Sequence, residues 1–201
     1  DGYFDMLIDN RKNLWVASSN GLYNIFSQNF TEISFPDFQN GGEVQGIVQD
    51  DNGKMWFGSF NNGIWCINSK LVAPVPVESV INLRNAGYKQ YPQIYPQASK
   101  IGNHIFFPAT EGILAVSAQQ ARFIKTPWDV CFGVREERSS GNIYTGTSHG
   151  IKRLLKYDSL LDLSAKTFLN SLPVAGMYND NAGNVIVVNQ KGAYKIQHDT
   201  L

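Results

Sequence analysis

The side chains that could support metal or acid–base chemistry in this chain are three histidines and one pair of adjacent carboxylates: His104, His149, His198, Glu136 and Glu137. Metal sites need ligands that converge on one point, but the histidines lie far apart along the chain and predict no shared site. Neighbouring residues of a strand point to opposite faces, so the two glutamates predict no general acid–base pair. We expect both glutamates in a solvated turn and His149 exposed to solvent.

Other signatures of catalysis are also missing from the sequence, which has no Ser-His-Asp order and no nucleophile elbow. Gly41, Gly42 and Gly87 do not lie between a strand and a helix, where a phosphate-binding glycine loop belongs. The chain is therefore predicted not to be an enzyme and to use no cofactor and no metal.

One segment, residues 82–97, is rich in residues that suit ligand binding, because tyrosine and arginine together with amides can stack on a sugar or peptide and hydrogen-bond to it. Loops on a rigid scaffold often carry function. The candidate ligand-binding residues are those of this segment and one from a second connection: Arg84, Tyr88, Tyr91, Tyr95 and Trp128. The alternative is that the segment packs over the next repeat or over a neighbouring domain. Residues 35–40 are a weaker candidate loop.

The candidate residues lie within a sequence pattern that repeats along the chain. Five glycines mark it: Gly21, Gly63, Gly112, Gly150 and Gly192. An aromatic or aliphatic residue lies six positions before the glycine in four copies, and Trp56 lies seven before Gly63. Repeats of roughly 40–50 residues are typical of four-stranded propeller blades. The period therefore predicts an array of blades.

Each repeat contains an apolar run, a turn rich in Asp, Asn and Gly, an aromatic strand, a glycine turn and a further strand, which is an all-β pattern. Fourth strands are predicted at 30–35, 71–77, 121–126 and 166–170, and a weak helix-like run covers 159–166. The predicted fold is a partial all-β propeller of about five four-stranded blades. It forms a single segment, 1–201, with repeats at 3–42, 43–92, 93–127, 128–170 and 171–201.

The last repeat is predicted to lack its outer strand, because the chain ends just after its third strand. Natural proteins cover unpaired strand edges. We therefore expect either that the segment comes from a longer propeller region or that a second copy covers this edge.

The overall composition limits the kinds of partner that the sequence predicts. Lys plus Arg and Asp plus Glu each number 17, so the net charge is zero, and no basic stripe predicts nucleic-acid binding. No apolar run is long enough to predict a membrane-spanning helix. Cys66 and Cys131 are expected to be two small buried apolar side chains without a disulfide.

The repeat resembles the two-component regulator propeller repeat, whose pattern is Asp-x-x-Gly-x-Leu-Trp-x-Gly-Thr followed by Gly-Leu-Tyr. Residues 50–59 with 63–65 are a near match, and residues 9–18 with 21–23 and 141–147 with 150–151 are similar. The copies at 105–113 and 185–193 lack the Gly-Thr pair. The resemblance covers essentially the whole chain.

The motif residues Trp15, Trp56, Tyr144, Asp9 and Asp50 are expected to be structural. The aromatic residue would fill the wedge between adjacent blades, where a large flat side chain buries much area. The glycine after it would let a neighbouring strand approach closely, and the aspartate would bind turn amides.

The resemblance implies the periplasmic sensor region of a hybrid two-component sensor histidine kinase from a bacterium that forages on polysaccharides. The implied ligand is an oligosaccharide. The implied partners are the remaining propeller, a β-sandwich and a kinase core, none of which is in this sequence. Whether the segment also forms a homodimer is left open. This segment would contact neither nucleic acid nor membrane. The alternatives are a non-catalytic interaction scaffold and a propeller lyase or glycosidase.

Overall fold

The computed structural model describes residues 2–26, 29–33, 43–60, 63–68, 71–74, 92–117, 121–155, 159–162 and 172–197. All regular secondary structure in these ranges is β-strand, and none of them contains a helix that could cross a membrane. The strands form antiparallel sheets in which neighbours in sequence pair with one another. The all-β prediction is confirmed.

The first half of the chain forms two four-stranded sheets, which we call blades 1 and 2. Blade 1 contains β1 (Tyr3–Ile8), β2 (Leu14–Ser18), β3 (Gly21–Phe26) and β4 (Asn29–Ile33). Blade 2 contains β5 (Val44–Gln49), β6 (Met55–Ser59), β7 (Gly63–Asn68) and β8 (Leu71–Pro74).

The second half forms a six-stranded and a three-stranded sheet. The larger contains β9 (Ser99–Ile101), β10 (His104–Val116), β11 (Ala121–Glu137), β12 (Asn142–Thr147), β13 (Gly150–Leu155) and β14 (Ser159–Asp162). The smaller, blade 5, contains β15 (Val174–Asn179), β16 (Val185–Asn189) and β17 (Gly192–Ile196). The first part of β11 pairs with β10 and the second part with β12. The six-stranded sheet is therefore two units that share a strand, which we call blades 3 and 4.

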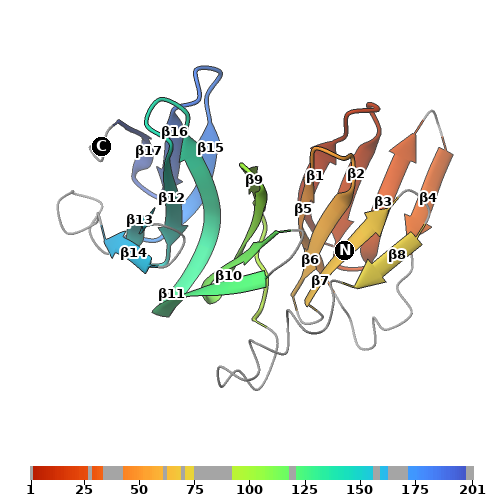
Figure 1. Cartoon of the computed structure of the whole chain (residues 1–201), viewed down its shortest axis with the longest axis horizontal. Helices are drawn as coiled ribbons and strands as arrows, with labels where there is room; N and C mark the ends of the chain where they lie inside the picture. Colours follow the sequence, from red (N-terminus) through yellow and green to blue (C-terminus); the bar gives the residue numbers. More distant parts are fainter. Residues whose placement is uncertain are drawn as a thin grey trace.

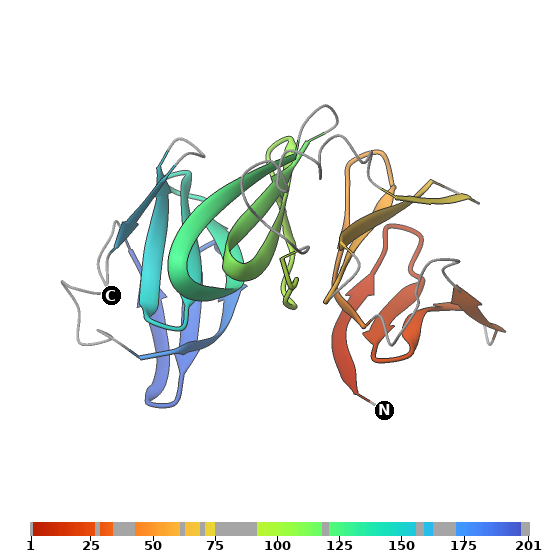
Figure 2. The same ribbon diagram turned by 90° about the horizontal axis from the view of Figure 1, so that it is seen from below.

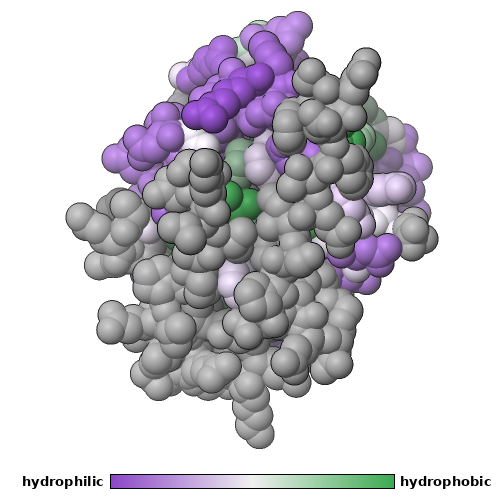
Figure 3. All heavy atoms as spheres, turned by 90° about the vertical axis from the view of Figure 1, so that its right-hand side faces the viewer, coloured by the Kyte–Doolittle hydropathy of each residue, from purple (hydrophilic) through white to green (hydrophobic). Residues whose placement is uncertain are grey.

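The blades follow one another in an arc that does not close into a ring (Figure 2). Figure 1 shows this arc from the side, with the turns between the first and second strands of blades 1, 4 and 5 at the upper end. We call this the turn end. The turn between β1 and β2 exposes Asn10, Arg11 and Lys12, and the upper edge of the molecule is hydrophilic in Figure 3. The arrangement confirms a partial propeller, while the repeat boundaries stay a prediction.

The core lies between blades, and each junction contains an aromatic residue of a second strand. Trp15 packs with Phe57 between blades 1 and 2, and Trp56 packs with Phe107 between blades 2 and 3. The next two junctions contain Phe106 with Val134 and Tyr144 with Met177. The prediction that these residues fill the wedges between blades is confirmed.

The glycines of the motif allow the close approach that was predicted for them. A Cβ on Gly58 would lie 2.4 Å from Cγ2 of Ile94, and a Cβ on Gly146 would lie 2.4 Å from Cγ1 of Val174. Real Cβ atoms do not approach other heavy atoms so closely. Both partners belong to the next blade, so these two glycines set the spacing between blades.

The acidic residue before the turn binds turn amides in blades 1 and 2, as predicted for Asp9 and Asp50. Asp9 accepts hydrogen bonds from the backbone N–H groups of Arg11 and Asn13, both at 2.8 Å. It also accepts one from Nε1 of Trp15 at 3.0 Å. The acid therefore fixes the turn and the orientation of the core indole together.

In blade 4, Glu137 lies before the turn and its side chain accepts from hydroxyl groups, so the prediction that this residue lies in a solvated turn is wrong. Glu137 is buried and accepts hydrogen bonds from Oγ of Ser140 at 2.6 Å and from the hydroxyl of Tyr144 at 3.3 Å. Its longer side chain reaches a phenol where Asp9 reaches an indole. Glu136 is exposed, as expected.

The helix-like run predicted at 159–166 is also wrong for its first part, which is strand β14. Pairing of β14 with β13, for example Leu160 with Leu154, overrides the weak local preference. The predicted strand at 166–170 lies outside the described residues. Cys66 and Cys131 are buried and are not joined by a disulfide, as expected.

Candidate functional site

The structure describes the side chain of one of the five predicted ligand-binding residues, Tyr95. Arg84, Tyr88 and Tyr91 lie outside the described residues, and Trp128 lies in β11 but its side chain is outside the described part. The site is therefore built from Tyr95 outward.

Tyr95 lies between two aromatic rings from other blades. Its ring meets Phe60 edge-on, with centroids 5.8 Å apart, and Phe132 edge-on, with centroids 5.6 Å apart. Phe60 follows β6 in blade 2, and Phe132 belongs to the blade 4 part of β11. Such edge-to-face pairs are worth about 0.5–1.5 kcal/mol each beyond the area they bury. We call these three residues the aromatic row, and it connects blades 2, 3 and 4.

The chain next to Tyr95 runs through the centre of the arc, where glycines on the inner strands make room for it. Cβ atoms on Gly46, Gly133 and Gly176 would lie within 3.2 Å of side-chain atoms of Ala98 or Gln97. These glycines belong to blades 2, 4 and 5. The segment before β9 is therefore enclosed by three other blades.

Gln97 is the hub of this central packing. Its Oε1 accepts a hydrogen bond from the backbone N–H of Met177 at 2.9 Å, and its carbonyl accepts one from Nη1 of Arg135 at 3.1 Å. Its φ of 67° places a non-glycine residue in the left-handed region. Strained residues of this kind persist only where the surroundings hold them, and they concentrate at binding sites and switches.

An acid and a base of opposite charge flank Gln97. Burial raises the pKa of Asp5, although backbone N–H groups, that of Ile47 first, and the charge of Arg135 act in the opposite direction. Burial lowers the pKa of Arg135, and the charge of Asp5 opposes that shift. We call Asp5, Gln97 and Arg135 the axial cluster, and it connects blades 1, 3 and 4.

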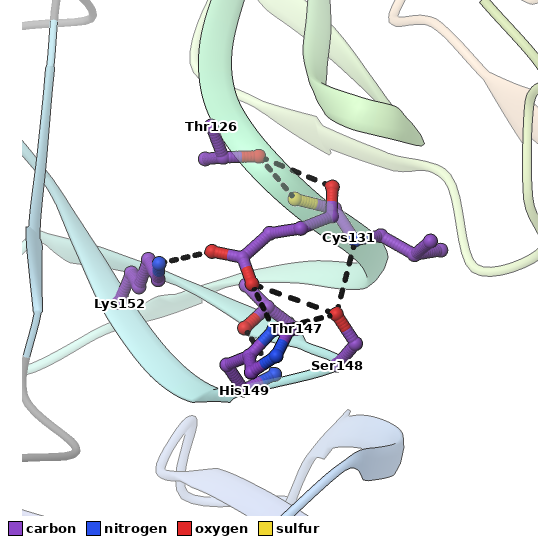
Figure 4. Close-up of polar contacts among 8 residues, drawn as sticks. Thr126, Cys131, Thr147, Ser148, His149 and Lys152 are labelled. Atoms are coloured by element: carbon purple, nitrogen blue, oxygen red, sulfur yellow. Dashed lines mark hydrogen bonds and ion pairs between the residues drawn. The ribbon is translucent and has the colours of Figure 1, made fainter. Parts of the chain in front are cut away.

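A second polar group surrounds Asp129 in blade 4, and Figure 4 labels its partners Ser148, His149 and Lys152. His149 lies in an exposed turn, as predicted, but its Nδ1 is 2.5 Å from Oδ1 of the buried Asp129. Lys152 pairs with the other carboxylate oxygen. Because Nδ1 faces the carboxylate and the His149 side chain is 60% exposed, Nε2 is the ring nitrogen left for the role of a general base.

The remaining titratable groups near Asp129 do not extend this chemistry. Burial raises the pKa of Cys131 to about 11, so its thiol stays protonated at neutral pH. Among the described residues, no three His, Cys, Asp or Glu side chains come together in a way that would hold a metal ion.

One repeat of the chain matches a known protein family. The profile of the two-component regulator propeller family matches residues 39–61, which include the turn between β5 and β6 and the strand with Trp56. At residues 39–61 the chain is therefore similar to a two-component regulator propeller repeat. No curated protein matches the chain.

Solved structures show the same fold as this propeller chain at low identity. Virginiamycin B lyase from Staphylococcus aureus has a TM-score of 0.74 at 14% identity, over 98% of this chain and 70% of the lyase. The extracellular domain of the hybrid two-component system BT4673 from B. thetaiotaomicron has a TM-score of 0.73 at 16% identity. That of BT3049 has a TM-score of 0.71 at 17% identity. The chain covers 26% and 27% of these two domains, to which 98% and 95% of it align.

Sequence reasoning missed most of the residues around Tyr95. Gln97 and Arg135 are 38 residues apart in the sequence and belong to different blades of the propeller. No short-range pattern connects them. One signal was present for Phe60, because the extra residue between Trp56 and Gly63 lengthens the turn that contains it.

Proposed function

We propose that this chain is a ligand-sensing segment of the extracytoplasmic propeller region of a hybrid two-component sensor. Its ligand is an oligosaccharide, and it signals to a kinase core outside this chain, from the periplasmic side of the inner membrane. The match at residues 39–61 and the fold shared with the BT4673 and BT3049 extracellular domains support the proposal.

The observation that carries the proposal is the position of Tyr95 two residues before Gln97. Tyr95 contacts two aromatic rings, and Gln97 binds Arg135 and Met177 in two other blades. A ligand that stacks on the aromatic row would therefore shift the backbone at Gln97, the residue that connects the blades. A sensor needs such a link between the binding residue and the arrangement of its parts.

Exposed apolar side chains at both ends of the arc support further partners. Met6 and Ile8 on β1 are each 68% exposed, and Tyr178 on β15 is 53% exposed. Apolar surface of this kind often marks an interface. We propose that the remaining propeller of the parent sensor packs against these ends.

The test is a binding screen of the 201-residue chain against oligosaccharides by isothermal titration calorimetry. We expect saturable binding that Tyr95→Ala weakens roughly fivefold, the value of one aromatic contact. Tyr95→Phe keeps the ring and serves as the matched control. Absence of binding to every oligosaccharide, or binding indifferent to Tyr95→Ala, would contradict a sensor site at the aromatic row and favour an interaction scaffold.

A lyase is a second candidate, and the Asp129–His149 pair is the observation that favours it. A carboxylate that holds Nδ1 leaves Nε2 ready to take a proton. Turnover assays on polysaccharide substrates separate the two functions. Product formation that disappears in His149→Ala would establish the enzyme and overturn the sensor reading of this segment.

A further inference from the structure

We propose a second binding site for one neutral sugar residue, in a cleft between blades 2 and 3 at the turn end. The choice of a saccharide rests on the proposed function, but the site is separate from the aromatic row. The cleft has a volume of about 460 Å³, within the range of small-molecule sites. The turn between β5 and β6 lines one side, and β9 and β10 line the other.

The floor of the cleft is apolar. It contains Trp56, Ile105 and Val116, all of which are buried. Nε1 of Trp56 donates a hydrogen bond to Oδ2 of Asp50 at 3.0 Å, which fixes the orientation of the indole. A sugar ring has an apolar face, and a fixed apolar floor with an indole at its edge suits that face.

The rim of the cleft is polar. Nζ of Lys100 lies 2.7 Å from Oδ2 of Asp51 and connects the two blades across the rim. Asn52 and Asn103 are exposed amides on the same rim. Exposed ion pairs contribute little to stability. Ligand hydroxyl groups can therefore replace this pair at small cost.

At the turn end, hydrogen bonds rather than an ion pair join blade 1 to blade 2 and blade 4 to blade 5. Between blades 1 and 2, the backbone N–H of Asn10 donates to Oε1 of Gln49 at 3.0 Å. Between blades 4 and 5, the backbone N–H of Arg138 donates to the carbonyl of Gly183 at 2.9 Å. Strand pairing places Gln49 and Lys100 at the same position of their blades. Blade 3 thus has a long cation where blade 2 has a short amide, and the cation spans a cleft.

The charge of the lining selects among sugars. Asp50 and Asp51 contribute two carboxylates, and they are balanced by the ammonium groups of Lys100 and of Lys54, which lies 5.0 Å over the Trp56 ring. An anionic sugar would therefore gain no net attraction, whereas hydroxyl groups can donate to Asp51 and accept from Lys100 and the amides. A neutral sugar residue, free or at the end of an oligosaccharide, is therefore the expected occupant.

The test follows the indole N–H signal of Trp56 in ¹⁵N-labelled full chain by NMR, with Trp56→Phe to assign it. The probes are D-glucose, D-galactose, D-mannose and N-acetyl-D-glucosamine, with D-glucuronate as the anionic comparison. We expect a saturable shift with at least one neutral sugar and none with D-glucuronate. Lys100→Met should weaken the affinity about tenfold, as expected for loss of a hydrogen bond to a charged group.

Three variants make the result decisive. Asn103→Trp fills the cleft from an exposed turn position and should abolish the shift, while Lys191→Met, an exposed lysine of blade 5, should leave it unchanged. Tyr95→Ala should also leave the Trp56 shift unchanged. This variant therefore separates binding in the cleft from binding at the aromatic row. A shift that survives Asn103→Trp, or no saturable shift with any of the four neutral sugars, overturns the proposal.

Discussion

Oδ2 of Asp50 accepts a hydrogen bond from Nε1 of Trp56 at 3.0 Å, across the turn between β5 and β6. Oδ1 of the same carboxylate accepts from the backbone N–H groups of Asn52 and Lys54, both at 2.9 Å. One side chain thus satisfies the turn and fixes a core ring, and blade 1 repeats the arrangement with Asp9 and Trp15.

Asp50→Asn should lower the free energy of unfolding by about 1–2 kcal/mol, because an amide nitrogen facing the indole N–H would cost one hydrogen bond to a charged acceptor. Urea unfolding of the chain measures this difference. Asp51→Asn is the matched control, because the side chain of Asp51 is 77% exposed and its ion pair is expected to add little. Equal losses in the two variants would refute a special role for Asp50.

Gly146→Ala should destabilise the chain by about 1–3 kcal/mol, the usual cost of overpacking a core. The new methyl group would lie 2.4 Å from Cγ1 of Val174, so the packing of blade 5 on blade 4 must change. Val174→Ala in the same chain removes that carbon and should recover part of the loss. A double-mutant cycle on the unfolding free energies shows the coupling, and strict additivity would mean that the two positions do not touch.

The repeat was predictable because its determinants are local. The acid before the turn, the aromatic residue and the glycine all lie within ten residues of one another, as in Asp50, Trp56 and Gly58. The side-chain bond between the acid and the ring was not predicted. Glu137 was misjudged because strand alternation says nothing of a residue at the start of a turn, where its own loop can enclose it.

The site was less predictable because its determinants are distant in the sequence. Tyr95 was selected for its residue type, but the rings that meet it, Phe60 and Phe132, come from other blades. Gln97 has no chemistry of its own, and its role comes from two inner-strand glycines, Gly133 and Gly176, and a left-handed backbone. Such a role depends on the closeness of the blades, which no single repeat encodes.

The stability of the chain should depend on pH through Asp5. Burial raises its pKa above the usual value near 3.8, although hydrogen bonds from backbone N–H groups and the charge of Arg135 oppose this. A carboxyl whose pKa is higher in the folded state contributes stability below its unfolded pKa and loses that contribution as the pH rises through its folded pKa. The free energy of unfolding of Asp5→Asn, relative to that of the parent chain, should therefore be higher at pH 7 than at pH 3.5.

Urea unfolding at these two pH values tests the assignment, with Asp51→Asn as an exposed control that should show little such change. A variant that becomes relatively less stable as the pH rises would mean that the charged form of Asp5 is favoured in the fold. The attraction of Arg135 would then outweigh burial.

Gln97 offers the sharpest test of the link between the aromatic row and the blades. Gln97→Ala removes the acceptor for the backbone N–H of Met177 but keeps a Cβ at a φ of 67°. Leaving that buried N–H unpaired should cost about 1–3 kcal/mol. Gln97→Gly removes the same acceptor and also relieves the left-handed strain, so it should be less destabilising by about 0.5–1 kcal/mol.

Hydrogen exchange at Met177 gives the local measurement. Both variants should speed exchange of this amide, because its acceptor is lost, while the amide of Asn184, held by Asp180 in the same blade, should be unaffected. If ligand binding at the aromatic row reaches blade 5 through Gln97, ligand should slow exchange at Met177 in the parent chain and not in Gln97→Ala. Equal protection in both chains would show that the signal bypasses Gln97.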